Sequence, residues 1–414
     1  MKPPPPPGPP VRLWAAGCAF VAALALFGVL HWTVQANLRQ HIERFNVYPQ
    51  PEKLIGVALP RQAFSDPSLL PVFGSSELTQ PQANRADEFF HAHPTGFGAF
   101  LMGNPGETCL IIANRLAATG PEARGKKAVV FLSPGWFLAP ELDHPGFGVN
   151  FSPLQGGIFA YESRLSPELK RDLARRLLDY PETIRQSPLL ETALASLAGR
   201  ATWGDELLAA AAPFGATQNR VQREMDYFRV GLWWREHPAT GGTAPGAVGS
   251  IDWNRRLKEA DAAYARQPAL TSYSTGPSND FDTNLQKRFV DPKRPEVTPD
   301  QNFETALAAS KEWTDFQLML RTARELKIHL LLVCQPLNAK FSQLQGLTAR
   351  SNTLFYDRLR QTVAPFKARL ITFPDGEPDP HFYRDCVHPS AKAWIAYDAA
   401  LDAFYHEPVA ADSL

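Results

Sequence analysis

The sequence has few cysteines, no excess of either charge and no internal repeat. Its 414 residues include 4 Cys, and 42 Lys and Arg balance 42 Asp and Glu. Balanced charge without a basic tract or an RNA-binding aromatic motif argues against a nucleic-acid-binding protein. The chain has no C-x-x-C or H-E-x-x-H pattern, and His91 with His93 is too little for zinc, so no metal and no cofactor are predicted. The lack of repeats argues against a solenoid.

The low cysteine content also limits disulfide bonding. Cys18 lies in an apolar run, which leaves Cys109, Cys334 and Cys386. Three cysteines form at most one bridge within the chain, and their spacing does not select the pair. Cys386 is more typical of a small buried residue than of a nucleophile.

A long uncharged segment near the amino terminus predicts a membrane helix. Leu13–Leu30 has no charged side chain and, at ~1.5 Å per residue, spans about 27 Å, close to the thickness of a bilayer core. Trp32 follows it, as expected at a membrane interface. We predict a disordered proline-rich tail at 1–12 and an uncleaved transmembrane anchor at 13–34. The alternative is a secretory signal cleaved after Val34-Gln35-Ala36.

Five short apolar runs predict the strands of a parallel sheet. They are Leu69–Phe73, Ala99–Met102, Ala128–Leu132, His329–Val333 and Leu370–Phe373. Helical patterns separate several of them, for example Glu107–Ala118, Phe303–Leu326 and Ser351–Lys367. Alternating strands and helices favour right-handed crossovers and a parallel sheet with helices on both faces. This α/β domain is predicted at 50–160 and 267–414, with a helical insertion at 161–266.

Small or polar residues follow each of these runs. Ligand sites in parallel sheets lie beyond the carboxyl ends of the strands. The segments there are Gly74-Ser75-Ser76-Glu77, Gly103-Asn104-Pro105-Gly106, Ser133-Pro134-Gly135-Trp136-Phe137, Gln335-Pro336-Leu337-Asn338 and Pro374-Asp375-Gly376. The sequence therefore predicts a functional site at this edge of the sheet.

Two motifs far apart in the chain predict a serine nucleophile and its base. Ser76 follows the first predicted strand, and Asp385 and His388 form a D-x-x-H motif before the last helix. A serine hydroxyl becomes a nucleophile when an imidazole accepts its proton, and a carboxylate must hold that imidazole in the right tautomer. We predict Ser76 as nucleophile, His388 as general acid and base, and Asp385 as the residue that orients His388.

Four further residues are candidates for an oxyanion or substrate site. Backbone N–H groups after Ser76 and at Gly103 are natural oxyanion donors, although Gly103 has the alternative role of closing a tight turn. Ser133 follows the third strand, where its hydroxyl or amide is placed to contribute. Glu77 is expected to cap the next helix rather than to react. Trp136, in the segment after the third strand, is the fourth candidate for this site.

Together the motifs resemble the DltD family. G-S-S-E-L after the first strand, S-P-x-W-F after the third and a terminal F-x-x-D-x-x-H follow an amino-terminal membrane helix in that family's order. The resemblance implies an SGNH-hydrolase-like (flavodoxin-like) fold, with Ser76, Asp385 and His388 at the family's catalytic positions. It also implies D-alanyl transfer to (lipo)teichoic-acid-like acceptors, with a membrane-bound O-acyltransferase and an acyl-carrier protein as partners. The resemblance further implies that the amino terminus lies on the cytoplasmic side of the cell membrane and the catalytic domain on the outer side.

The resulting hypothesis is a membrane-anchored, extracytoplasmic serine acyltransferase or esterase that acts on an envelope polymer. Ser76 would attack an ester or thioester, and His388 would then activate a polymer hydroxyl or water. Because both acceptors need the same base, the residues alone do not separate transferase from esterase. The alternatives are a polysaccharide O-acetyl esterase or acetyltransferase of the same fold, and a non-enzymatic, membrane-tethered assembly factor.

Overall fold

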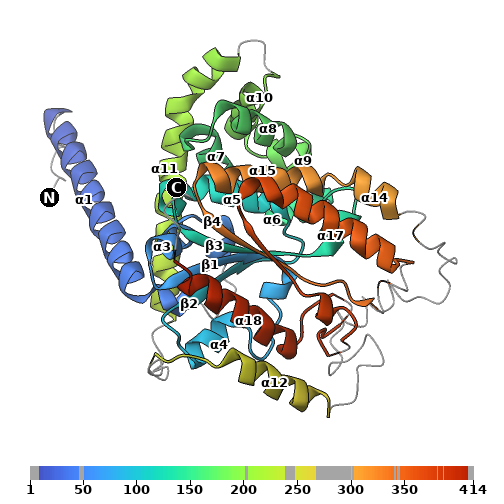
Figure 1. Ribbon diagram of the computed structural model, residues 1–414. Coiled ribbons are helices and arrows are strands. Elements are labelled where there is room, and N and C mark those ends of the chain that lie inside the picture. The colour runs from blue at the N-terminus through green and yellow to red at the C-terminus, as the bar shows by residue number, and fades with distance from the viewer. Residues whose placement is uncertain are drawn as a thin grey trace.

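Five parallel strands form one sheet between two layers of helices in the computed structural model (Figure 1). The structure describes residues 9–45, 51–200, 204–237, 248–266, 300, 303–339, 342, 346–379, 381–385 and 387–408. The strands are β1 (Leu69–Gly74), β2 (Gly98–Gly103), β3 (Lys127–Leu132), β4 (His329–Cys334) and β5 (Arg369–Thr372). Each lies within one residue of a predicted run at both ends, and the predicted fold class is confirmed.

The sheet has the flavodoxin-like strand order β2-β1-β3-β4-β5. Successive side chains of a strand point to opposite faces. In β3, Val130 and Leu132 therefore enter one core, and Val129 and Phe131 enter the other. The first core lies under α5 (Cys109–Thr119), α15 (Glu312–Glu325) and α17 (Ala349–Val363). The second lies under α4 (Ala86–Ala92) and α18 (Ala391–His406).

One predicted helix is two helices in the structure. The pattern at Phe303–Leu326 forms α14 (Phe303–Ala309) and α15, which are separated at Ser310 and Lys311. The Ser310 hydroxyl accepts from the N–H of Glu312 at 3.3 Å, and the N–H of Lys311 donates to the carbonyl of Pro140 at 2.7 Å. Because another segment takes this N–H group, it makes no helical hydrogen bond and the helix ends.

The region 161–266 is helical as expected, and its helices lie on both sides of the sheet. On the α15 side are α8 (Pro167–Leu177), α9 (Pro181–Ile184) and α10 (Pro188–Leu197), and α11 (Gly204–Glu236) runs from this layer past the edge of the sheet, as Figure 1 shows. They pack with α6 (His144–Asn150) and α7 (Pro153–Glu162). On the other side α12 (Trp253–Tyr264) packs on α18. The division of the chain into an α/β domain at 50–160 and 267–414 and a helical insertion at 161–266 stays a prediction.

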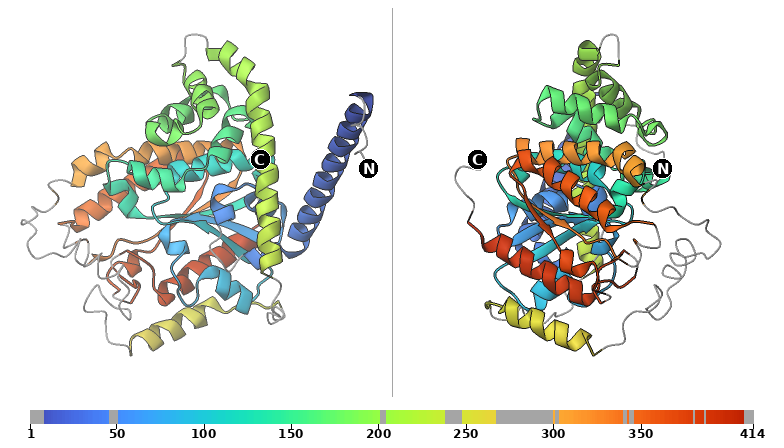
Figure 2. Two further views of the ribbon diagram at one scale, coloured as in Figure 1. Left: turned by 180° about the vertical axis from the view of Figure 1, so that it is seen from behind. Right: turned by 45° about the vertical axis from the view of Figure 1, so that its right-hand side comes forward.

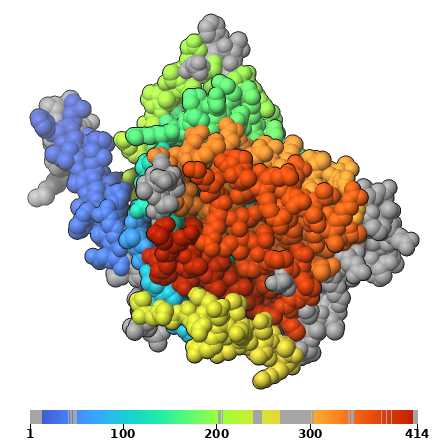
Figure 3. Space-filling model, in the orientation of Figure 1, coloured from blue at the N-terminus to red at the C-terminus, as the bar shows by residue number. Residues whose placement is uncertain are grey.

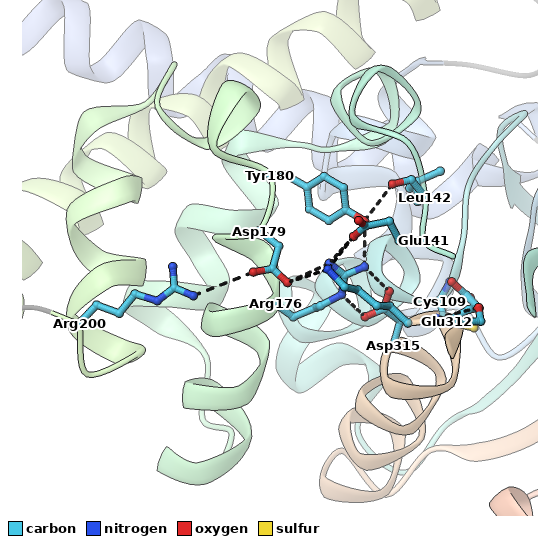
Figure 4. A network of polar contacts seen from close by, with 11 residues as sticks. Cys109, Glu141, Leu142, Arg176, Asp179, Tyr180, Arg200, Glu312 and Asp315 are labelled. Atoms are coloured by element: carbon cyan, nitrogen blue, oxygen red, sulfur yellow. Dashed lines mark hydrogen bonds and ion pairs between the residues drawn. The ribbon is translucent and has the colours of Figure 1, made fainter. Parts of the chain in front are cut away.

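A buried arginine joins α8 to α15 (Figure 4). Arg176 donates to both carboxylate oxygens of Asp315, from Nε at 2.8 Å and from Nη2 at 3.0 Å. Nη2 also donates to the hydroxyl of Tyr180 at 2.9 Å, which in turn donates to the carbonyl of Leu142 at 3.2 Å. Removing Arg176 would leave the buried carboxylate of Asp315 without its ion-pair partner. This ion pair therefore fixes the helices of the 161–266 region to the layer that covers the sheet.

The amino-terminal helix α1 (Pro9–His41) is longer than the predicted anchor at 13–34. Leu13–Gln40 is its candidate membrane span. The most apolar 18 residues of this span have a mean hydropathy of 2.3, and none of them is buried. Figure 3 shows the amino-terminal half of α1 projecting from the rest of the molecule. Val34 and Leu38, near its other end, are buried. Two short helices, α2 (Pro51–Ile55) and α3 (Ala58–Ser65), then lead into β1.

Candidate active site

Ser76, His388 and Asp385 meet at the carboxyl edge of the sheet. The distance from His388 Nε2 to Ser76 Oγ is 2.8 Å, and the distance from His388 Nδ1 to Asp385 Oδ2 is 2.7 Å. Ser76 begins a 3-10 turn (Ser76–Leu78) directly after β1, and the other two lie in the loop before α18. The fold therefore brings together two segments that are 312 positions apart in the chain. This hydrogen-bonded order is the one that a serine nucleophile requires.

Asp385 both shapes its loop and orients the imidazole. Its Oδ1 accepts from the N–H groups of Val387 at 2.9 Å and His388 at 2.8 Å, while Oδ2 faces Nδ1 of the ring. Burial alone would raise the pKa of Asp385, but the hydrogen bond and charge of His388, with the two N–H groups, lower it below its usual value. An ionised carboxylate favours the tautomer with hydrogen on Nδ1. Nε2 is then the acceptor for the proton of Ser76.

A small hairpin holds this loop against α18. The N–H of Arg384 donates to the carbonyl of His388 at 2.9 Å, and the N–H of Ser390 donates to the carbonyl of Phe382 at 3.0 Å. The hydroxyl of Ser390 then caps α18, accepting from the N–H groups of residues 392 and 393. His388 is only 3% exposed and has little freedom to move.

Glu77 stabilises the turn that carries Ser76. Its Oε1 accepts from the N–H of Ser75 at 2.6 Å, and the residue is 3% exposed. Burial raises the pKa of Glu77, although hydrogen bonds from backbone N–H groups and from Gln335 oppose this. A Cβ added at Gly74 would lie 2.2 Å from the carboxylate, so a glycine is required there. Glu77 therefore binds the turn before it, rather than capping the helix that follows.

Sequence reasoning missed the role of Ser75, whose only signal was the doubled serine of the motif. Its Oγ donates to the carbonyl of Asn104 at 3.2 Å and accepts from the N–H of Gly106 at 3.1 Å. The side-chain amide of Asn104 donates to Asn150 Oδ1 at 2.7 Å. Ser75 thus ties the end of β1 to the loop after β2, and it fixes the backbone next to Ser76.

The other predicted residues also lie at or near this edge. Gly103 pairs with Gly74 at the ends of β2 and β1, and an added Cβ would lie 2.8 Å from the Ser75 carbonyl oxygen. Ser133 is half-buried directly after β3, and Trp136 packs on the hydrophobic core from the next turn (Pro134–Leu138). Close packing accounts for the glycine at Gly103. Oxyanion roles for Gly103 and Ser133, and a substrate role for Trp136, stay predictions.

The described residues contain no group of three or more His, Cys, Asp or Glu side chains that could hold a metal ion. Cys109 and Cys334 are free and buried, and burial raises the pKa of both thiols. Cys386, within the D-x-x-H motif, lies outside the described residues.

The fold and the geometry of this edge define an SGNH-hydrolase-like α/β protein, with a hydroxyl–imidazole–carboxylate array beyond β1. The family model described as "DltD protein" matches residues 47–406. The chain belongs to the DltD family.

Three curated relatives match along most of their length. The chain is 27% identical over 357 residues to "Protein DltD" of Bacillus subtilis (strain 168), covering 86% of this chain and 87% of that protein. It is 23% identical over 349 residues to "Protein DltD" of Staphylococcus aureus (strain NCTC 8325 / PS 47), covering 83% of each. For "Protein DltD" of Lacticaseibacillus rhamnosus the identity is 26% over 379 residues, with coverage of 89% and 84%.

Proposed function

We propose that this chain is a membrane-anchored, extracytoplasmic serine acyltransferase that takes part in D-alanylation of teichoic acids. The hydrogen-bonded array of Ser76, His388 and Asp385 is the observation that carries the proposal. Membership of the DltD family directs it to D-alanine and to an envelope polymer. The exposed apolar length of α1 supports a membrane anchor. The placement of the sheet and its site outside the cell follows the family resemblance alone.

In the first half of the reaction, Ser76 Oγ attacks the carbonyl carbon of a D-alanyl ester or thioester. His388 Nε2 takes the hydroxyl proton as the new C–O bond forms, and Asp385 stabilises the resulting imidazolium. Backbone N–H groups near Ser76 and Gly103 stabilise the oxyanion. The intermediate then expels an alcohol or a thiol, which receives the proton from His388, and the D-alanyl group remains on Ser76.

In the second half, a hydroxyl of the polymer replaces the leaving group. His388 removes its proton, the polymer oxygen attacks the acyl-enzyme, and the proton returns to Ser76 as its ester bond breaks. The product is a D-alanyl ester on the polymer. On the donor side, the proposed partners are a membrane-bound O-acyltransferase and an acyl-carrier protein.

A fluorophosphonate probe tests the nucleophile, because it reacts with activated serine hydroxyls. The full-length protein should be labelled, and Ser76→Ala should remove the label. Ser65→Ala is the control, since Ser65 is exposed at the end of α3, where its hydroxyl donates to the carbonyl of Arg61, and labelling at Ser76 should be unchanged. Wild-type labelling of Ser76→Ala would refute the assignment.

The acyl group is tested by measuring the release and transfer of D-alanine and of acetate from envelope polymers. We expect turnover of D-alanine that depends on Ser76. Acetate turnover without any effect on D-alanine would identify an O-acetyl esterase or acetyltransferase instead. Turnover of neither, in a protein that still binds its partners, would favour an assembly factor.

A further inference from the structure

Glu77 is a buried acid that follows Ser76 directly in the chain. It is 3% exposed, and its Oε1 accepts from the N–H of Ser75 at 2.6 Å. Among the described residues, no lysine or arginine forms an ion pair with Glu77, since Arg115 is paired with Glu107 instead. Moving a carboxylate out of water without a cation beside it is unfavourable, so the acid at this position needs a physical reason.

The turn that carries Ser76 needs a hydrogen-bond acceptor at this position, but it does not need a charge. A glutamine has the same length as a glutamate, and its amide oxygen would also accept from the N–H of Ser75. The close approach at Gly74, where an added Cβ would lie 2.2 Å from Oε1, leaves room for either group. The hydrogen bond therefore explains where the side chain lies, but not why it is an acid.

Hydrogen-bond donors are directed at this carboxylate. The N–H of Ser75 and the N–H of Glu77 itself donate to it, and so does the side chain of Gln335, which follows β4. Burial raises the pKa of Glu77, and these donors oppose that rise because they favour the ionised form.

The other titratable groups that face Glu77 supply no positive charge in the resting site. Glu107 and Arg115 are joined by two hydrogen bonds, at 2.5 and 3.1 Å, and are neutral as a pair. Burial and the charge of Glu77 raise the pKa of Tyr397 on α18, so its hydroxyl stays neutral. His388 is the group that becomes positive during the reaction, and its charge lowers the pKa of Glu77.

The interaction between Glu77 and His388 is mutual. If a proton on His388 favours the ionised form of Glu77, then ionised Glu77 favours the proton on His388 by the same free energy. His388 receives that proton when Ser76 attacks, since Nε2 lies 2.8 Å from Ser76 Oγ. The attraction is therefore stronger in the transition state than in the resting site, and an interaction of this kind accelerates the reaction.

We propose that the buried charge of Glu77 stabilises the imidazolium of His388 during acyl transfer. Asp385 bonds to Nδ1 at 2.7 Å, and Glu77 adds a second negative charge from the turn that carries Ser76. Glu77 acts on His388 and not on the reacting atoms. The inference rests on the proposed function, because it requires Ser76 as the nucleophile and His388 as its base.

The pH dependence of fluorophosphonate labelling tests this proposal on the full-length protein. The rate constant of labelling is measured from about pH 5 to about pH 9, and it should rise to a plateau because the reaction needs neutral His388. Glu77→Gln removes the charge and keeps an acceptor for the N–H of Ser75. A rate constant describes the molecules that react, so partial loss of folded protein does not change it.

Glu77→Gln should move the pH of half-maximal labelling down by about 0.5–1 unit and lower the plateau rate by about three- to tenfold. Asp226→Asn is the matched control. Asp226 is also 3% exposed, and it accepts from the N–H groups of Val57 and Ala58 at 2.8 Å each. It lies on α11, which runs along the opposite side of the molecule from the loop before α18 in the left view of Figure 2. Its pH profile should match that of the wild type.

A wild-type midpoint in Glu77→Gln, at any rate, would overturn the proposal, because a distorted turn slows labelling at every pH without moving the midpoint. An equal shift in Asp226→Asn would also overturn it. Glu77→Asp keeps the charge and should keep a midpoint near the wild-type pH. This variant decides the question if Glu77→Gln does not fold, and a midpoint lowered by about one unit would then overturn the proposal. A wild-type protein without labelling that depends on Ser76 would refute the proposed function and this inference together.

Discussion

Replacing Asp385 with asparagine should inactivate the site without unfolding the protein. Oδ1 of Asp385 accepts from the N–H groups of Val387 and His388, and Oδ2 faces Nδ1 of the ring at 2.7 Å. An asparagine that keeps both backbone bonds must turn its NH₂ group toward Nδ1. Nδ1 must then accept a hydrogen bond, so the ring proton moves to Nε2. Nε2 would then face Ser76 as a donor, and the serine would have no base.

The structure sets the size of the expected effects. With the wrong tautomer, the rate of acylation should fall by about 10³- to 10⁴-fold, or about 4 to 5.5 kcal/mol of transition-state stabilisation. Asp385→Asn keeps an acceptor for the buried N–H of His388 and the partly buried N–H of Val387, so the free energy of unfolding should change little. Asp385→Ala removes that acceptor, and the unpaired buried N–H of His388 should cost about 1–3 kcal/mol of stability.

The assay is the rate of fluorophosphonate labelling of the full-length protein, measured beside its thermal unfolding midpoint. Asp385→Asn should lose labelling and unfold at the wild-type temperature. Asp385→Ala should lose labelling and unfold at a lower temperature. An asparagine variant that is labelled at the wild-type rate would show that Asp385 does not set the tautomer of His388. The proposed order of proton transfer would then be wrong.

Three further predictions concern packing and burial. Gly74→Ala should abolish fluorophosphonate labelling, because the added Cβ would lie 2.2 Å from the Glu77 carboxylate that holds the turn. Gly135→Ala is the control and should keep its labelling, because the nearest atom to its added Cβ is 3.5 Å away. Equal labelling of the two variants would contradict this prediction. Arg115→Leu should destabilise the protein by about 3–5 kcal/mol in denaturant titrations, because Glu107 would remain buried without its partner; a loss below ~1 kcal/mol would contradict the buried pair. Burial raises the pKa of Glu312, so at intermediate pH the folded chain keeps a proton that the unfolded chain releases. The folded state is therefore more stable at acid pH, where Glu312 is protonated, and loses stability as the pH rises. Glu312→Gln should therefore raise the melting temperature more at about pH 8 than at about pH 5, and equal shifts would refute this.

The strands could be predicted from the sequence because each is a short, mainly apolar run that ends in small or polar residues, and β1 to β4 are largely buried. The break between α14 and α15 could not, because it depends on the carbonyl of Pro140 in a distant segment. An apolar periodicity continues through Ser310 and Lys311, and nothing local shows that the N–H of Lys311 has another acceptor. The position of α12 across the sheet from α8 and α10 likewise depends on packing alone.

The candidate site could be predicted in its principal residues but not in their support. Ser76, Asp385 and His388 stand in short motifs whose chemistry can be read from residue types. Glu77 and Ser75 belong to the same motif, yet their roles follow from hydrogen bonds to backbone groups. Backbone groups have no signature in a sequence, so the support of the turn was not foreseen.

By itself, the sequence determined the strands, the apolar anchor and the types of side chain that a serine nucleophile needs. These features are encoded locally, in hydrophobic periodicity and in motifs of a few residues. Only the tertiary structure decided that His388 lies 2.8 Å from Ser76 and that α11 runs beside α1. Such contacts join segments hundreds of residues apart, and their approach depends on strand order and on the packing of whole helices.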